Sequence, residues 1–165
     1  MLENPSDGDL WAAVDDAAEL IRDHELEAAL TSLRDVLAKN PANYYAFHFL
    51  GIALFEARNF AAARDAYQAA VRLAPQFLGA RVHLVHVLRS LGQLKDAYSH
   101  AETARRQAPD DPEVWHAIGL VHAATGQYGL ARKYLHAFLE SNPELEVAME
   151  VRSLLRLFPD ADPTE

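Results

Sequence analysis

The feature that most constrains this chain is a period of 34 residues. Prolines recur at this interval, at Pro41, Pro75, Pro109 and Pro143. An alanine stands twelve residues before each of them, at Ala29, Ala63, Ala97 and Ala131. Self-similarity at a fixed period of this size marks repeat architectures, in which one supersecondary unit cannot bury its apolar face alone and stacks on its neighbours. The sequence therefore predicts four copies of one unit.

Each repeat is predicted to hold two helices. In residues 44–57 apolar side chains recur at helical spacing, with Gly51 where a partner helix must approach closely. A short break follows, with Gly92 and Gly126 at the C-cap position that requires a positive φ in two of the repeats. A second helix then runs toward the proline. Proline ends the unit because it cannot continue a helix and biases the preceding residue away from helical angles.

The residues at the repeated positions also form a known pattern. In the second repeat they are Phe47, Leu50, Gly51, Leu54, Ala63, Tyr67, Ala70 and Pro75, and in the fourth Trp115, Ile118, Gly119, Ala131 and Pro143. This pattern resembles the tetratricopeptide repeat (TPR) family. The third repeat departs from it at Arg81, and the first at Ala13 and Asp16. The resemblance implies an all-α fold, a right-handed α-solenoid of four helix-turn-helix repeats plus a C-terminal capping helix.

The expected organisation follows the repeat boundaries. An N-terminal segment covers residues 1–9, and the four repeats cover 10–43, 44–77, 78–111 and 112–143. A capping helix is expected at 144–158 because Leu145, Ala148, Val151, Leu155 and Phe158 share one helical face. Val147 and Leu154 add a second apolar edge, so a homodimer surface stays open as an alternative. The acidic, proline-containing residues 159–165 are expected to be a disordered tail.

Composition excludes several classes of protein. The 165 residues carry a net charge of −9, whereas neutralising nucleic-acid phosphates or an anionic membrane surface needs clustered Lys and Arg. There is no cysteine for disulfides, thiolate metal sites or a thiol nucleophile. No apolar run approaches the ~20 residues of a membrane span. Because residues 1–10 lack a basic side chain, no signal peptide is expected and the chain is predicted to be cytoplasmic.

The sequence shows no catalytic constellation. It lacks a phosphate-binding glycine loop, a nucleophile elbow and a His-Glu-x-x-His motif. The adjacent acids Asp15 and Asp16 point about 100° apart on a helix and would not converge on a substrate. We therefore expect a protein that is not an enzyme and that needs no cofactor.

The resemblance also implies a concave surface built from the first helix of each repeat. The candidate partner-binding residues on it are Trp11, Tyr45, His48, Phe49, Ile52, Phe55, Val82, His83, His86, Arg89, His116 and Leu120. The second repeat holds eight of the fifteen aromatic residues, more than its own core positions require. Surplus aromatic side chains on a concave face are typical of binding anchors. The positions of a carboxylate clamp, Val14, Ala18, Phe49, Gly79 and His83, lack its Lys and Asn donors.

These observations favour an adaptor, scaffold or small chaperone, monomeric or weakly homo-oligomeric. Its ligand would be an apolar or amphipathic segment of a partner protein, bound in the concave groove. A self-assembling structural solenoid, associating through its terminal helix or groove, is an alternative. A weaker alternative is a metal- or pH-responsive module, because His48, His83, His86 and His116 map to one face and imidazole both binds metals and titrates near neutrality. No metal-ligating set can be assigned from the sequence.

Overall fold

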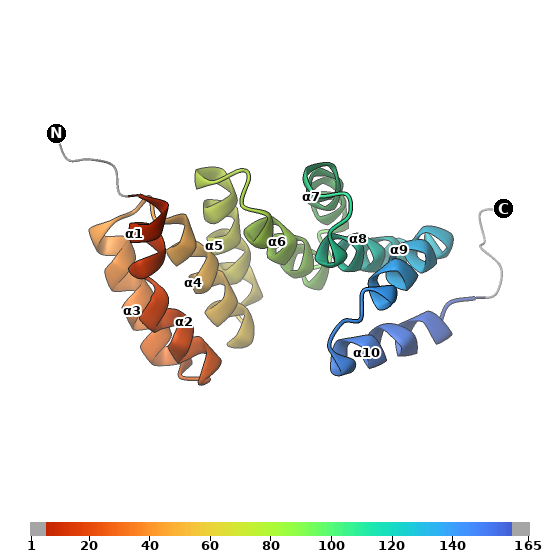
Figure 1. Ribbon diagram of the computed structural model, residues 1–165, viewed down its shortest axis with the longest axis horizontal. Coiled ribbons are helices and arrows are strands. Elements are labelled where there is room, and N and C mark those ends of the chain that lie inside the picture. The colour runs from red at the N-terminus through yellow and green to blue at the C-terminus, as the bar shows by residue number, and fades with distance from the viewer. Residues whose placement is uncertain (1–5, 160–165) are drawn as a thin grey trace. The chain divides into compact units, whose positions relative to one another are not determined.

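The computed structural model describes residues 6–159, and every regular element within them is a helix (Figure 1). The helices are α1 (Asp7–Ala12), α2 (Asp15–Arg22), α3 (Leu26–Lys39), α4 (Tyr44–Glu56), α5 (Phe60–Leu73), α6 (Leu78–Ser90), α7 (Leu94–Gln107), α8 (Pro112–Ala124), α9 (Tyr128–Glu140) and α10 (Leu145–Arg156). The chain forms two compact units, an N-terminal unit that ends at Val87 and a C-terminal unit that begins at Leu88.

The helix ends follow from local hydrogen bonding. Asn43 and Asn59 cap α4 and α5. The side-chain oxygen of each accepts a hydrogen bond from the backbone N–H three residues later in the chain, at 3.0 and 3.3 Å respectively. Asp111 caps α8 in the same way. Pro112 occupies the first helical position, where the absence of an N–H loses no hydrogen bond because the first N–H groups of a helix have no acceptor within it. Gly92 and Gly126 adopt φ values of 72° and 76°, which confirms the predicted C-cap glycines. The predicted helix pairs of the second and fourth repeats are therefore present as α4–α5 and α8–α9.

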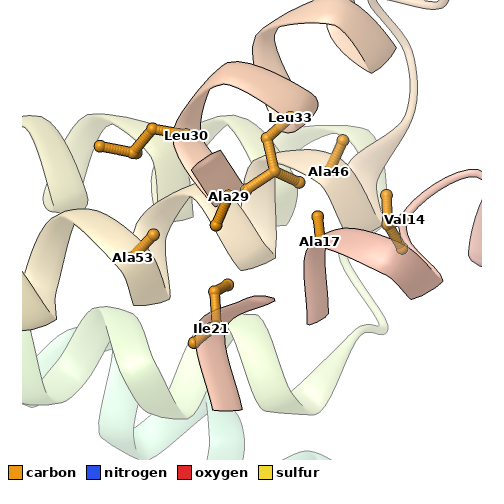
Figure 2. Packing of buried hydrophobic residues seen from close by; sticks show 8 residues of the cluster. All are labelled: Val14, Ala17, Ile21, Ala29, Leu30, Leu33, Ala46 and Ala53. Atoms are coloured by element: carbon orange, nitrogen blue, oxygen red, sulfur yellow. The ribbon is translucent and has the colours of Figure 1, made fainter. Parts of the chain in front are cut away.

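The N-terminal unit is built on a tightly packed cluster of small and branched side chains (Figure 2). It combines residues of α3 and α4 with residues of α2 and of the turn before it. The members are Val14, Ala17, Ile21, Ala29, Leu30, Leu33, Ala46 and Ala53. Four alanines in this set let the helix backbones approach closely, while Leu33, which is fully buried, fills the space between them.

In two of the helix pairs, a glycine sets the distance between the two helices of the pair. A Cβ at Gly51 on α4 would lie 2.5 Å from Cε1 of Tyr67 on α5, and a Cβ at Gly119 on α8 would lie 2.8 Å from Cδ2 of Leu135 on α9. Neither distance leaves room for a methyl group. The close approach predicted at Gly51 is confirmed, and the same constraint recurs in the C-terminal unit.

The first repeat differs from expectation because its first helix is broken. A turn at Ala13 and Val14 separates α1 from α2, and the Val14 N–H bonds back to the Trp11 carbonyl at 2.9 Å. The Val14 side chain is completely buried there. The break lets the two short helices take different neighbours: α1 contacts α4, whereas α2 packs mainly against α3. Residues 6–159 therefore contain ten helices in place of the nine expected.

In the C-terminal unit, α10 packs against α9. Ala148, Val151 and Phe158 are buried, as their shared helical face predicts. Leu145, expected on the same face, is instead 72% exposed. Helical side chains lean toward the N-terminus, so the first side chain of α10 projects beyond the contact. The predicted tail at 159–165 lies outside the described residues except for Pro159, as do residues 1–5 of the predicted N-terminal segment.

We predict that Gly51→Ala lowers the free energy of unfolding by about 2 kcal/mol, because the new methyl group overpacks against the Tyr67 ring. Chemical denaturation followed by circular dichroism measures the change. The control is Gly8→Ala, where the nearest atom to the new Cβ is Ser6 Oγ at 3.8 Å, and no loss is expected. Equal stability of the two variants would contradict the assigned contact.

Candidate partner-binding site

The site begins with a polar connection between α1 and the start of α4. The buried Asn43 side chain accepts from the Ala46 N–H and donates through Nδ2 to the Leu10 carbonyl at 2.9 Å. The hydroxyls of Tyr44 and Tyr45 both donate to the Asp7 carboxylate, the second at 3.3 Å. Desolvation and the hydrogen bond to Asp7 raise the pKa of Tyr44, which keeps its hydroxyl a donor. These bonds hold α1 in place against α4.

Held in this way, α1 places Trp11 over two aromatic rings of α4. The Trp11 ring meets Tyr45 edge to face, with centroids 5.2 Å apart, and meets Phe49 at 5.6 Å. Trp11 remains 45% exposed, while Tyr45 and Phe49 are half-buried and pack against the core cluster of Figure 2 on their inner sides. We call Trp11, Tyr45 and Phe49 the aromatic surface. Aromatic rings contribute most to binding when they lose solvent contact, so the part of Trp11 left exposed is available to a ligand.

The other predicted residues of α4 lie further along the helix. Ile52 is half-buried and packs against the same core cluster. The Phe55 ring contacts Phe60 of α5 at 5.0 Å, so it serves the contact between the two helices of its own repeat.

His48 is buried, which corrects its assignment to the groove surface. His48 is 8% exposed, and the centroid of its ring lies 4.8 Å from that of Phe77 and 5.1 Å from that of His83 on α6. The His48 and His83 rings are nearly parallel. Helical spacing assigns His48 to a face of its helix, but it cannot show that the rings of Phe77 and His83 pack against it there. Val82 is also buried, at 5% exposed, and belongs to the core. His83 and His86 remain half-buried.

Burial keeps the stacked histidines neutral. It lowers the pKa of His48 to about 3, with a further contribution from His83, and it lowers the pKa of His83 as well. The Nδ1 atoms of both rings have no hydrogen-bond partner. No group of three His, Asp or Glu side chains within residues 6–159 is arranged to hold a metal ion. The two rings therefore behave as aromatic packing residues near neutral pH.

The remaining candidates belong to the C-terminal unit. The His116 ring on α8 stacks on Phe138 with centroids 4.4 Å apart. Burial, together with nearby Arg89, lowers the pKa of His116 to about 4. Leu120 is half-buried and packs against the cluster around Phe138 and Val151.

The structure thus brings together only part of the predicted set. Trp11, Tyr45 and Phe49 share a surface in the N-terminal unit, where His48 is buried and His83 half-buried, whereas Arg89 and His116 belong to the C-terminal unit. Sequence reasoning missed four residues that build the site: Asp7, Asn43, Tyr44 and Phe77. Of these, only Tyr44 and Phe77 gave a signal, as members of the aromatic excess in the second repeat.

Comparison with known proteins agrees with the helix pairs. Three models described as tetratricopeptide repeat match residues 14–76, 54–121 and 112–145, which together span most of the chain. The chain belongs to the tetratricopeptide repeat family. The TPR fold accounts for the all-α architecture and confirms the predicted fold class. Among curated proteins, none matches the sequence significantly.

Solved TPR structures resemble this one over most of its length. A thermophilic TPR protein in Thermus thermophilus is 24% identical, with a TM-score of 0.71 over 88% of this chain and 79% of that one. YrrB, described as a TPR protein with an unusual peptide-binding site, is 22% identical, with a TM-score of 0.69 over 87% of this chain and 74% of that one. The first TPR of Spaghetti, bound to an HSP90 peptide, is 16% identical, with a TM-score of 0.66 over 73% of this chain and 95% of that one. Within residues 6–159 of this TPR protein, no helix is long and apolar enough to cross a membrane.

We predict that acid destabilises this TPR protein through His48. The pKa of His48 is about 6.5 in the unfolded state and about 3 in the folded state. Between these two pH values His48 is therefore protonated in the unfolded chain and neutral in the folded chain. Between pH 7 and pH 5 this one side chain lowers the free energy of unfolding by up to about 2 kcal/mol. The dependence is measured by denaturation at both pH values.

His48→Phe should reduce this loss, because phenylalanine keeps the ring contacts and cannot be protonated. The control is Leu33→Ala, which removes a buried leucine and should lower stability by the same amount at both pH values. An unchanged pH dependence in His48→Phe would show that His48 is not the buried neutral group.

Proposed function

We propose that this TPR protein is a protein-binding adaptor, scaffold or small chaperone that acts by binding and not by catalysis. Its ligand is an apolar or amphipathic segment of a partner protein, held on the aromatic surface, and it acts in the cytoplasm. The observation that carries this proposal is the position of Trp11, a large apolar side chain that two ring contacts hold in place and that stays 45% exposed. A fixed, exposed aromatic ring binds with little loss of conformational entropy.

Two of the similar structures support peptide binding as the mode of action. YrrB is described as having an unusual peptide-binding site, and the first TPR of Spaghetti is bound to an HSP90 peptide. The HSP90 peptide, SRMEEVD, has three acidic residues among its last four, whereas the aromatic surface of this chain offers ring faces. We therefore propose a ligand that inserts one or two large apolar side chains, such as the hydrophobic stripe of an amphipathic helix.

We predict that Trp11→Ala weakens binding of such a segment at least tenfold, because truncating an aromatic anchor at an interface costs about 2 kcal/mol. A peptide is first selected from a random library on the wild-type protein, and its Kd is then measured for each variant by isothermal titration calorimetry. The control is Tyr98→Ala, which removes an aromatic side chain of similar exposure, 42%, from α7. If both variants bind as tightly as the wild type, the aromatic surface is not the binding site.

Self-assembly through α10 is a second candidate, because two of its side chains form an exposed apolar pair. Leu145 and Met149 lie one turn apart and are 72% and 58% exposed. Exposed apolar neighbours of this kind favour association with another apolar surface.

This candidate predicts weak dimerisation that Met149→Glu abolishes, since burying an unpaired carboxylate at the contact is unfavourable. Sedimentation velocity over a range of protein concentrations measures it. The control is Arg152→Glu, which changes charge at another exposed position of the same helix without altering the apolar pair. A wild-type protein that stays monomeric at every concentration eliminates this candidate.

A further inference from the structure

Three aromatic rings within residues 6–159 have one of the protein's own cations over them. The distance from the charged group to the ring centroid is 5.5 to 5.8 Å in the pairs Arg58–Phe60, Arg132–Phe158 and Lys133–Tyr134. A cation over a ring face is attracted by the ring quadrupole, and tryptophan attracts it most strongly. In the same part of the chain no lysine or arginine lies over Trp11, although its side chain is 45% exposed.

The rings beside Trp11 leave ring faces uncovered. Trp11 meets Tyr45 at an interplanar angle of 87° and Phe49 at 62°. In an edge-to-face contact one of the two rings uses its edge, so that contact does not cover its faces. Sites that bind organic cations are built from several aromatic rings around one position. The aromatic surface has this composition.

A carboxylate lies beside the aromatic surface. Asp7 is exposed, precedes Trp11 by one turn of α1, and accepts from the hydroxyls of Tyr44 and Tyr45. Both donors are neutral, so these hydrogen bonds leave the negative charge of Asp7 in place. A carboxylate has about four acceptor sites, so Asp7 can also accept from a cation of a ligand.

The charge around the aromatic surface is acidic. Residues 6–43 hold nine acidic and three basic side chains, whereas residues 44–87 hold two acidic and four basic ones. All nine acids are exposed, and within the described part of the chain only Glu19 among them pairs with a basic side chain. Because such a surface attracts cations and repels anions, it favours a basic ligand.

We propose that the partner segment bound by the aromatic surface is basic, and that one of its arginines stacks on Trp11 and pairs with Asp7. The apolar side chains of the segment contact Tyr45 and Phe49. Cβ atoms one helical turn apart are about 5–6 Å from each other, so an arginine whose stem lies on the Trp11 ring reaches Asp7 with its charged end. Arginine suits both contacts, because its planar guanidinium stacks on rings and donates two parallel hydrogen bonds to a carboxylate. This inference rests on the proposed function and adds the charge of the ligand.

The test uses three blocked peptides that differ at one position. The first is acetyl-Gln-Leu-Ala-Gln-Leu-Leu-Gln-Ala-Leu-Arg-Ala-amide, whose leucines form one helical stripe with the arginine at its flank. The second has citrulline in place of arginine, which keeps the shape and removes the charge, and the third has glutamate. Binding is followed by NMR at pH 7 and constant ionic strength, through the indole N–H resonance of Trp11.

We expect the arginine peptide to bind at least fivefold more tightly than the citrulline peptide, as a ring contact and an exposed charge pair together permit. The glutamate peptide should bind more weakly than both. The second tryptophan of the chain, Trp115, is an internal control. It lies on α8, its indole N–H donates to the Pro109 carbonyl at 2.8 Å, and its resonance should not shift.

Variants separate the two contacts of the arginine. Asp7→Asn keeps an oxygen that accepts from the tyrosines but removes the charge, so it should weaken binding of the arginine peptide and leave the citrulline peptide unchanged. The matched control is Asp23→Asn, the same change of charge at the C-terminal end of α2, which should keep the full preference for arginine. Trp11→Phe, followed by isothermal titration calorimetry, should reduce the preference because phenylalanine attracts cations less strongly.

Equal affinity for the arginine and citrulline peptides would overturn the inference, as would tighter binding of the glutamate peptide. Equal weakening of both peptides by Asp7→Asn would show that Asp7 only holds α1 in place, and it would contradict the proposed pairing. If Trp11→Ala weakens both peptides while neither is preferred, the proposed function stands without the basic requirement. If Trp11→Ala changes the affinity for neither peptide, the proposed function fails as well.

Discussion

The architecture depends on how closely the two helices of a repeat can approach. In the N-terminal unit the Tyr67 ring lies directly against the backbone of Gly51, where even a methyl group would not fit. This contact decides which way α4 faces: Gly51 meets α5, and Ala46 and Ala53 meet the cluster shared with α2 and α3. With those sides occupied, the aromatic residues of α4 are left at the edge of the core. The C-terminal unit repeats the arrangement with Gly119 against Leu135.

In the N-terminal unit, the hydrogen bonds of a few polar groups fix the positions of aromatic residues that the core leaves partly exposed. Asn43 satisfies the first turn of α4 and at the same time holds α1 through the Leu10 carbonyl. Asp7 accepts from the hydroxyls of two adjacent tyrosines. Without these bonds α1, only six residues long, would have too little buried area to stay in place. The exposed position of Trp11 is thus a consequence of hydrogen bonds made elsewhere on α1 and α4.

Burial also decides what the charged and titratable residues do. His48 and His83 stack as neutral rings within the N-terminal unit, so they strengthen the support under the aromatic surface and cannot present a charge near pH 7. Arg89 shows the opposite outcome, because a guanidinium keeps its charge under the same desolvation. A net acidic chain therefore carries a partly buried arginine in its C-terminal unit and a partly exposed aromatic surface in its N-terminal unit.

The sequence by itself determined the 34-residue repeat, the paired helices, the glycine at the close approach and the aromatic excess of the second repeat. These follow from local periodicity and from steric rules that act within one helix or turn. The turn position where Gly92 and Gly126 have positive φ is filled by His24 and Arg58 in the first two repeats. Both adopt positive φ values, 59° and 60°, because the backbone of the turn requires that conformation whichever residue is present. Only the tertiary structure decided that α1 separates from α2, that Phe77 and His83 bury His48, and that Leu145 stays exposed. Helical periodicity assigns a side chain to a face, but what covers that face depends on residues distant in sequence.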